Sequence, residues 1–164
     1  MQALTMYRIL FALVLLLPLT PVSSEAFVFR KIVYCSPIEG FIHWQGKPLA
    51  NVVVTRELYS GGFEGGKYSD TATTGSDGRF KFEVVQERRF LRPDLLSANP
   101  RVSQFLIAKH KGFDYLVWTF DKLDFNFGTE ATGNLLKLEC DLSNAEDDAE
   151  LSIVRCKNNG VRKL

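Results

Sequence analysis

Apolar and charged side chains alternate most regularly between residues 79 and 84 of the chain. Phe80, Phe82 and Val84 occupy every second position there, and charged residues fill the positions between them. A period of two residues is typical of a β-strand that buries one face and exposes the other. The pattern therefore predicts a strand with three core side chains, each contributing about 1.5–3 kcal/mol if it is fully buried.

Other short apolar or β-branched runs predict further strands, separated by turn-forming residues. Gly46-Lys47-Pro48 supplies one turn, because glycine accepts a positive φ and proline fixes φ and ends the preceding strand. Asp77-Gly78 supplies a turn of a type that favours hairpins. The remaining predicted strands cover residues 38–44, 51–58, 67–73, 103–110, 114–120, 135–142 and 150–155. Residues 27–34 alternate loosely and could add an edge strand.

Three stretches interrupt the strand pattern. Residues 61–66 hold four glycines around Phe63, which predicts a flexible hairpin loop. Residues 86–102 are charged and contain two prolines, which predicts an irregular connection between strands. Residues 120–132 are aromatic, polar and irregular. Seven or eight short strands without a long helix predict an all-β sandwich.

The first 26 residues have the pattern of an export signal. Arg8 precedes a short apolar run, and Ser24 and Ala26 are small residues at the positions that a signal peptidase requires for cleavage after Ala26. The run is shorter than the ~20 residues of a membrane-spanning helix, although an uncleaved anchor is the alternative. We expect a signal peptide at 1–26 and a single soluble domain at 27–164, located in the periplasm or secreted.

The charge balance argues against two classes of partner. The chain carries 20 basic and 19 acidic side chains, which gives a net charge of +1. A balance so close to neutral argues against nucleic acid and against a strongly anionic membrane surface. Thirteen phenylalanines, five tyrosines and two tryptophans indicate a well-filled β core instead.

The cysteines predict one disulfide and no metal site. Cys140 and Cys156 end and follow neighbouring predicted strands, so we expect them to pair in an oxidising compartment. Cys35 is then free, or links two chains into a dimer. The cysteines lack the close spacing of a metal site, and His43 and His110 are isolated, so we expect neither a metal nor another cofactor.

No pair of a nucleophile and a base forms a catalytic pattern. Acyl transfer needs both groups together with a residue that orients the base. Cys35 and His43 are the only Cys/His pair near each other in the sequence. On one extended strand they lie about 26 Å apart. We therefore expect no catalytic residues.

The carboxylates offer two weaker candidates for cation binding. Asp147 and Asp148 adjoin in a predicted turn, which is typical of a solvated tip and also of weak calcium binding. Asp121, Asp124 and Glu130 could form an oxygen-rich cation site in their irregular segment. The spacing of a calcium-binding loop is missing from that segment.

A series of motifs resembles a known group of domains. The chain contains Gly40-x-Ile42, Gly46-Lys47-Pro48-Leu49-x-Asn51-Val52-x-Val54 and Thr74-x-x-Asp77-Gly78-Arg79-Phe80-x-Phe82. This series, over residues 40–85, resembles the transthyretin-like and carboxypeptidase-regulatory-like domains. The resemblance implies a single seven- to eight-stranded Greek-key β-sandwich of the transthyretin (prealbumin) type.

The resemblance constrains the fold more than the activity. The transthyretin-related hydrolases of purine breakdown use a His/Arg/His set and a C-terminal Tyr-Arg-Gly-Ser tail, whereas this sequence ends with residues 158–164, NNGVRKL. No second histidine pairs with His43. The layout, with a Trp-containing strand and Cys140-Asp141-Leu142, also resembles uncharacterised bacterial envelope proteins, which implies a bacterial periplasmic location.

These observations predict a non-enzymatic binding module that recognises a protein or peptide in the cell envelope, including an inhibitor or immunity protein. Aromatic and arginine side chains most often anchor such interfaces. The candidate binding residues are Phe63, Arg88, Arg89, Arg92, Trp118, Phe125 and Phe127. A structural or assembly factor of the envelope is the alternative, followed by a transthyretin-related hydrolase. A dimer through Cys35 would favour the structural role, and a deep pocket around His43 would favour the hydrolase.

Overall fold

The chain folds into β-sheets joined by turns and short 3-10 helices, which confirms the all-β prediction. The structure, a computed structural model, describes residues 29–90, 100–131, 135–147 and 152–158. Within these ranges there is no α-helix. There are thirteen strands, and four of them have only two residues each. Such two-residue strands carry no period, so the sequence pattern predicts only the longer ones.

Six strands form the larger sheet. Their order is β11 (Glu146–Asp147), β12 (Ser152–Ile153), β9 (Phe113–Lys122), β8 (Val102–His110), β4 (Val53–Tyr59) and β5 (Lys67–Thr73). The four long strands of this sheet are antiparallel to their neighbours, and β12 runs parallel to β9. The strands predicted at 67–73, 103–110 and 114–120 are all present here.

A second sheet contains five strands. They are β13 (Lys157–Asn158), β10 (Leu136–Asp141), β2 (Ile38–Trp44), β3 (Lys47–Pro48) and β6 (Arg79–Phe82), the last of which also pairs with β2. β10 runs parallel to β2, although it follows it by about a hundred residues. Gly40 lies opposite Phe80, and a Cβ at this glycine would lie 2.1 Å from the Phe80 ring. Only glycine leaves room for that ring.

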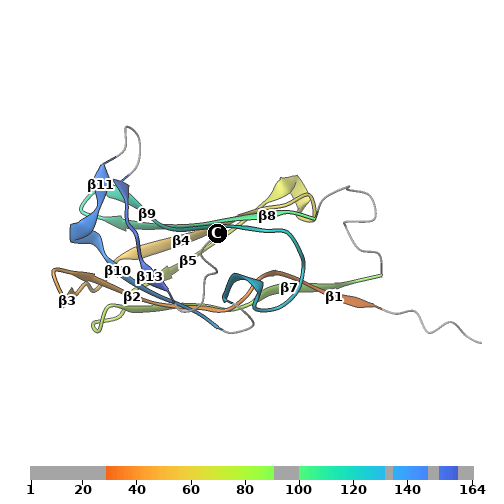
Figure 1. The fold of residues 1–164 in the computed structure, drawn as a ribbon, viewed down its shortest axis with the longest axis horizontal. Coiled ribbons are helices and arrows are strands. Elements are labelled where there is room, and N and C mark those ends of the chain that lie inside the picture. The colour runs from red at the N-terminus through yellow and green to blue at the C-terminus, as the bar shows by residue number, and fades with distance from the viewer. Residues whose placement is uncertain (1–28, 91–99, 132–134, 148–151, 159–164) are drawn as a thin grey trace, which may run out of the picture.

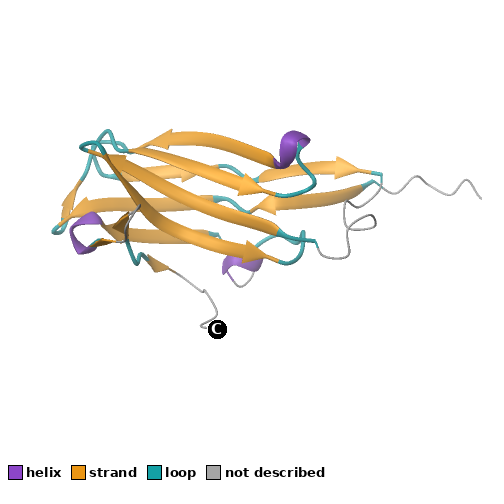
Figure 2. Cartoon of the chain, turned by 90° about the horizontal axis from the view of Figure 1, so that it is seen from above, coloured by secondary structure: helices purple, strands orange, loops and turns teal. Residues whose placement is uncertain are grey.

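The two larger sheets form two layers that enclose the core, the arrangement of a β-sandwich (Figure 1). Their strands run along the length of the molecule (Figure 2). Phe80 and Phe82 are buried, as their alternation predicts, while Val84 after the end of β6 is only half-buried. Among the most deeply buried side chains of the core are Ile38, Ile42, Val54, Leu58, Val102, Leu106, Leu136 and Leu142.

A register shift in β9 decides which of its side chains are buried. Leu106 pairs with Trp118 and Ile107 pairs with Leu116, so Val117 is an extra residue in β9. An extra residue reverses the side-chain alternation along the rest of the strand. Trp118 and Lys122 therefore point into the sandwich.

Residues 85–89 correct the prediction of an irregular connection. They form β7 (Val85–Arg89), which pairs antiparallel with β1 (Arg30–Cys35) in a separate two-stranded sheet. β7 has no apolar alternation, because its pairing with β1 rather than burial of one face makes it a strand. The two strands lie at the end of the molecule opposite β3 and β11 (Figure 1).

Glycines lie in the turns, and two turns differ from the prediction. The turn at Asp77-Gly78 joins β5 to β6, which belong to different sheets, so it is not a hairpin turn. Gln45 and Gly46 both have a positive φ and make the turn, whereas Lys47 and Pro48 already form β3. The glycine-rich loop at 61–66 is confirmed and ends in the 3-10 helix η1 (Glu64–Gly66). Two further 3-10 helices, η3 (Thr129–Ala131) and η4 (Leu142–Asn144), flank β10.

The predicted disulfide is present. Cys140 on β10 is bonded to Cys156, which follows β12, so the bond ties the C-terminal segment to the second sheet. No helix among the described residues is long and apolar enough to cross a membrane. The predicted signal peptide at 1–26 and residue Arg92 lie outside the described residues.

Candidate functional site

Positively charged side chains gather on the sheet of β1 and β7. Arg30 lies directly opposite Arg89, and Lys31 lies directly opposite Arg88. Like charges placed directly across a strand pair are destabilising. We call these four residues together the cationic arm. The sequence predicts Arg88 and Arg89 as binding residues, and the fold adds Arg30 and Lys31 from about sixty residues earlier.

Among the described residues, Arg89 is the one cation of the arm that has an ion pair or a hydrogen bond from its side chain. Arg89 is 2.5 Å from a carboxylate oxygen of Glu87, and its Nη2 donates a hydrogen bond of 2.6 Å to the carbonyl oxygen of Gly62. Arg30, Lys31 and Arg88 are exposed and form no ion pair with any residue in the part of the chain that the structure describes. Lys31 and Arg88 share one face of the two-stranded sheet and Arg30 lies on the other, and no described residue neutralises these three cations.

The arm also carries aromatic side chains and a depression. Phe29 and Phe90 flank its outer end, with exposed fractions of 62% and 53% and ring centroids 6.4 Å apart. Lys31, Gln86, Glu87 and Arg88 line a depression of about 280 Å³ on its surface. Exposed phenylalanines beside cations are typical of protein interfaces.

The predicted aromatic anchors differ in how far they are buried. Phe63 packs on Tyr34 and Phe125 meets the same ring edge-on, with centroid distances of 4.3 and 5.7 Å. Trp118 is buried against Phe120. Trp118 is therefore part of the core, whereas Phe63 and Phe125 are half-buried and pack against it. Phe127, by contrast, is half-exposed.

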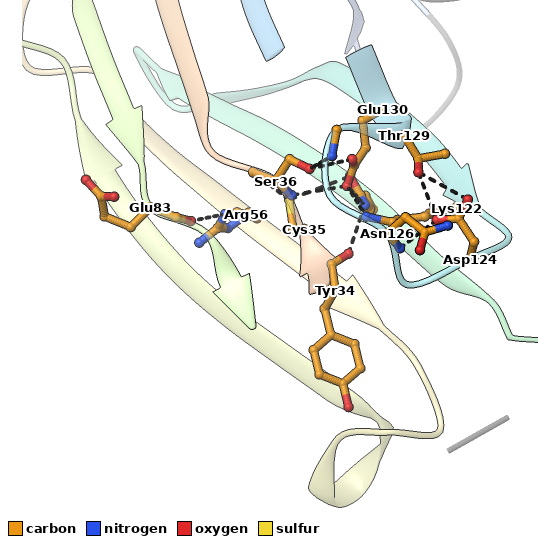
Figure 3. A network of polar contacts seen from close by, with 12 residues as sticks. Tyr34, Cys35, Ser36, Arg56, Glu83, Lys122, Asp124, Asn126, Thr129 and Glu130 are labelled. Carbon is orange, nitrogen blue, oxygen red and sulfur yellow. Dashed lines mark hydrogen bonds and ion pairs between the residues drawn. The ribbon is translucent and has the colours of Figure 1, made fainter. Parts of the chain in front are cut away.

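A second group of polar residues lies inside the sandwich (Figure 3). The Nζ of Lys122 is 3.1 Å from the Oε1 of Glu130, and both side chains are fully buried. Ser36 donates to the same carboxylate from its backbone N–H and from its hydroxyl, at 3.1 and 2.7 Å. Burial acts to raise the pKa of Glu130, but the Lys122 charge and the hydrogen bonds from Gln104 and Ser36 outweigh it and lower that pKa.

Gln104 and Cys35 extend this buried group. The Nε2 of Gln104 donates to Glu130 Oε1 at 2.8 Å and to the backbone oxygen of Tyr34 at 3.1 Å. The thiol of Cys35 donates to Gln104 Oε1 at 3.7 Å. Burial raises the pKa of Cys35 to about 12, so the group stays a neutral thiol. A disulfide between two chains at Cys35 would require β1 to move away from the core.

Arg56 is the remaining large buried cation. Its Nε and Nη2 donate to the two carboxylate oxygens of Asp70 at 2.9 and 2.6 Å, and its Nη1 donates to the backbone oxygen of Glu83 at 2.9 Å. The guanidinium also lies 4.7 Å from the centre of the Phe82 ring. A bidentate pair with an additional acceptor satisfies the buried charge, which indicates a structural role.

The candidate catalytic pair is separated in the structure. His43 lies beside two carboxylates of β10, with distances of 3.7 Å to Glu139 and 3.5 Å to Asp141, and its Nδ1 accepts a hydrogen bond from the Gly46 N–H. The Cys35 thiol contacts Gln104 instead. The two residues therefore occupy different surroundings.

The carboxylates of the predicted cation site also face different partners. Asp121 pairs with Arg101 and Ser103, Asp124 accepts hydrogen bonds from Asn126 and Thr129, and Glu130 pairs with Lys122. Across the described ranges, no group of three or more His, Cys, Asp or Glu residues could hold a metal ion. Sequence spacing alone suggested a cluster that the fold does not form.

Comparisons with known proteins identify a family but no activity. No curated protein matches the chain. Two chlorocatechol 1,2-dioxygenase structures, from Rhodococcus opacus 1CP and Pseudomonas putida, are 13% identical to it, with TM-scores of 0.30 and 0.29. The matches cover 76% of this chain and 59% of each dioxygenase, and a likeness of this size bears on neither fold nor chemistry. A family model described as a domain of unknown function, DUF6795, matches residues 38–145, and the chain therefore belongs to that family.

Proposed function

We propose that this protein is an exported, non-enzymatic binding module of the cell envelope that recognises an acidic segment of a protein or peptide through its cationic arm. The single observation that carries the proposal is the exposed placement of Arg30, Lys31 and Arg88 on two paired strands. The like charges that face each other across β1 and β7 repel one another in the free protein, and a bound anion would reduce this repulsion.

The surroundings of the arm support a protein partner. Phe29 and Phe90 offer apolar contact area next to the cations, and the depression beside Lys31 and Arg88 accepts a side chain. Arginine and aromatic residues are enriched at interface centres. An inhibitor or immunity protein would use such a surface in the same way.

The other polar groups support a binding role more than catalysis. Lys122, Glu130 and Gln104 are fully buried, so a dissolved substrate would not reach them. His43 is mostly buried beside Glu139 and Asp141. We also propose that the sandwich has the Greek-key order of the transthyretin type, on the strength of the motifs at residues 40–85.

Capture from the envelope fraction of the native host tests the proposal. The wild-type protein is compared with an arm variant, Arg30→Glu/Lys31→Glu/Arg88→Glu, and with a control variant that reverses the exposed residues Lys47, Lys81 and Lys157. We expect one protein to be captured in stoichiometric amount by wild type and control and to be lost with the arm variant. Equal capture by all three, or capture of lipid or nucleic acid alone, would contradict the proposal.

A further inference from the structure

Three reactive groups meet at a single atom inside the sandwich. Glu130 Oε1 accepts hydrogen bonds from the amine of Lys122 at 3.1 Å and from the carboxamide of Gln104 at 2.8 Å. The lysine nitrogen and the carboxamide nitrogen therefore both contact the same carboxylate oxygen. None of them is needed for binding at the cationic arm.

The deep burial of these three polar side chains is unusual. The exposed fractions are 0% for Lys122, 1% for Glu130 and 2% for Gln104. Removing an ion pair from water costs several kcal/mol per ion, and a well-packed apolar set is often at least as stable. Stability alone therefore gives little reason to keep a lysine and a glutamate at these positions.

The strand register brings the two nitrogen-bearing side chains to the same face. Gln104 pairs with Phe120 and Val102 pairs with Lys122, so Gln104 and Lys122 are diagonal neighbours on β8 and β9. Side chains of this length reach a diagonal neighbour across a strand pair. Both point into the sandwich because the extra residue Val117 reverses the alternation of β9.

We propose that Lys122 and Gln104 join in an amide bond, formed by the folded protein itself, between Lys122 Nζ and Gln104 Cδ. Glu130 first takes a proton from the Lys122 ammonium, which leaves a neutral amine. The amine attacks Gln104 Cδ, and Glu130 passes the proton to Gln104 Nε2. The bond between Cδ and Nε2 breaks, and the nitrogen leaves as ammonia. Glu130 then takes the second proton from the attacking nitrogen, which keeps the single hydrogen of an amide. Glu130 therefore ends as the neutral acid, all five protons of the ammonium and the carboxamide are accounted for, and no oxidant or reductant is required.

Two features of the surroundings bear on these steps. Burial favours the neutral amine and acid, because charges are poorly solvated in a water-excluded interior, and it acts against the hydrogen bonds and the Lys122 charge that lower the pKa of Glu130. The Cys35 thiol donates toward Gln104 Oε1, where negative charge develops during the attack. Its raised pKa keeps the proton on sulfur, so Cys35 acts as a donor and does not compete as a nucleophile.

The intact mass of the denatured wild-type protein tests the bond. We expect the mass to fall below that of the disulfide-bonded sequence by one ammonia molecule. Fragmentation should then recover one branched peptide that contains both residue 104 and residue 122. A mass equal to that of the disulfide-bonded sequence would overturn the proposal, and so would the loss of one water, which would join Lys122 to Glu130 instead.

Variants test the role of each group. Lys122→Arg keeps the buried cation without a nucleophilic amine, and Glu130→Gln removes the group that carries the proton. Neither variant should therefore show the loss of ammonia from its intact mass. Replacing exposed residues of the same types, in Lys81→Arg and Gln86→Asn, should leave the loss of ammonia unchanged. Loss of ammonia from Lys122→Arg would overturn the proposed bond at Lys122. If either buried variant fails to fold, the mass of the wild-type protein alone tests whether the bond is present.

Discussion

The buried cations Arg56 and Lys122 each have a carboxylate partner. Arg56 has Asp70, the Glu83 carbonyl and the Phe82 ring as partners, and Lys122 has Glu130. In the cationic arm, by contrast, Arg30, Lys31 and Arg88 face solvent without an ion pair to any described residue, and like charges lie directly opposite each other across the two strands. This contrast with the paired interior charges supports the arm as the binding site.

Cys35 gives a direct test of the interior at the residue scale. Because burial raises its pKa to about 12, the folded protein at pH 8 contains the neutral thiol, which alkylating reagents attack slowly. We expect iodoacetamide to label Cys35 only after denaturation. Mass spectrometry of labelled samples, with and without denaturant, measures this.

A covalent dimer would contradict that expectation. If Cys35 is as inaccessible as its 1% exposed fraction indicates, non-reducing gels of the folded protein should show a monomer. A Cys35-dependent dimer band, or rapid labelling without denaturant, would show that β1 opens. It would also favour the structural role over the binding role.

At the scale of elements, two glycine turns differ in what surrounds them. Gly78 has a φ of +75° and an added Cβ would lie 2.5 Å from the backbone oxygen of Ile42, whereas Gly46 has a φ of +79° with nothing within 4 Å. A left-handed backbone costs an alanine about 1–2 kcal/mol. At Gly78 the steric clash adds to this cost.

We therefore expect Gly78→Ala to lower the free energy of unfolding more than Gly46→Ala does. The control variant Gly46→Ala should lose about 1–2 kcal/mol through backbone strain alone. Urea unfolding followed by fluorescence measures both values. Equal losses in the two variants would show that the turn at Gly78 relaxes away from Ile42.

The sequence predicts elements wherever one strand carries its own pattern. Phe80 and Phe82 identify β6 because they alternate with charges, and Cys140 and Cys156 form the expected disulfide. β7 has no such pattern, since only its pairing with distant β1 makes residues 85–89 a strand. The burial of Lys122 could not be predicted from the sequence either, because the register shift at Val117 inverts the alternation of side chains along β9.

The candidate site was predicted in part for the same reason. Arg88 and Arg89 are visible as a local run, but Arg30 and Lys31 join them only through the pairing of β1 with β7. Aromatic composition predicts Phe63, Phe125 and Trp118 as surface anchors, whereas Trp118 is buried in the core and Phe63 and Phe125 are half-buried against it. Composition gives the kinds of residues at an interface, and the topology decides which of them are exposed.

At the scale of the whole molecule, the arm and the sandwich have different tasks. The disulfide and the two large sheets form a closed body, and β1 and β7, the strands of the arm, lie at one end of it (Figure 1). A net charge of +1 means that attraction to an anion depends on this local group rather than on the molecule as a whole. Binding should therefore weaken with salt, as surface charges are screened over about 10 Å at 0.1 M ionic strength.

The measurement that tests the central claim most directly is fluorescence anisotropy with a labelled glutamate-rich peptide and a glutamine-rich peptide of the same length. The wild type is compared with Arg30→Glu/Lys31→Glu/Arg88→Glu and with the matched Lys47→Glu/Lys81→Glu/Lys157→Glu control. Three exposed contacts at about 0.5 kcal/mol each correspond to about tenfold in affinity. We expect the arm variant alone to lose at least that factor for the acidic peptide, whereas equal affinity for both peptides, or an equal loss in the control, would contradict the account.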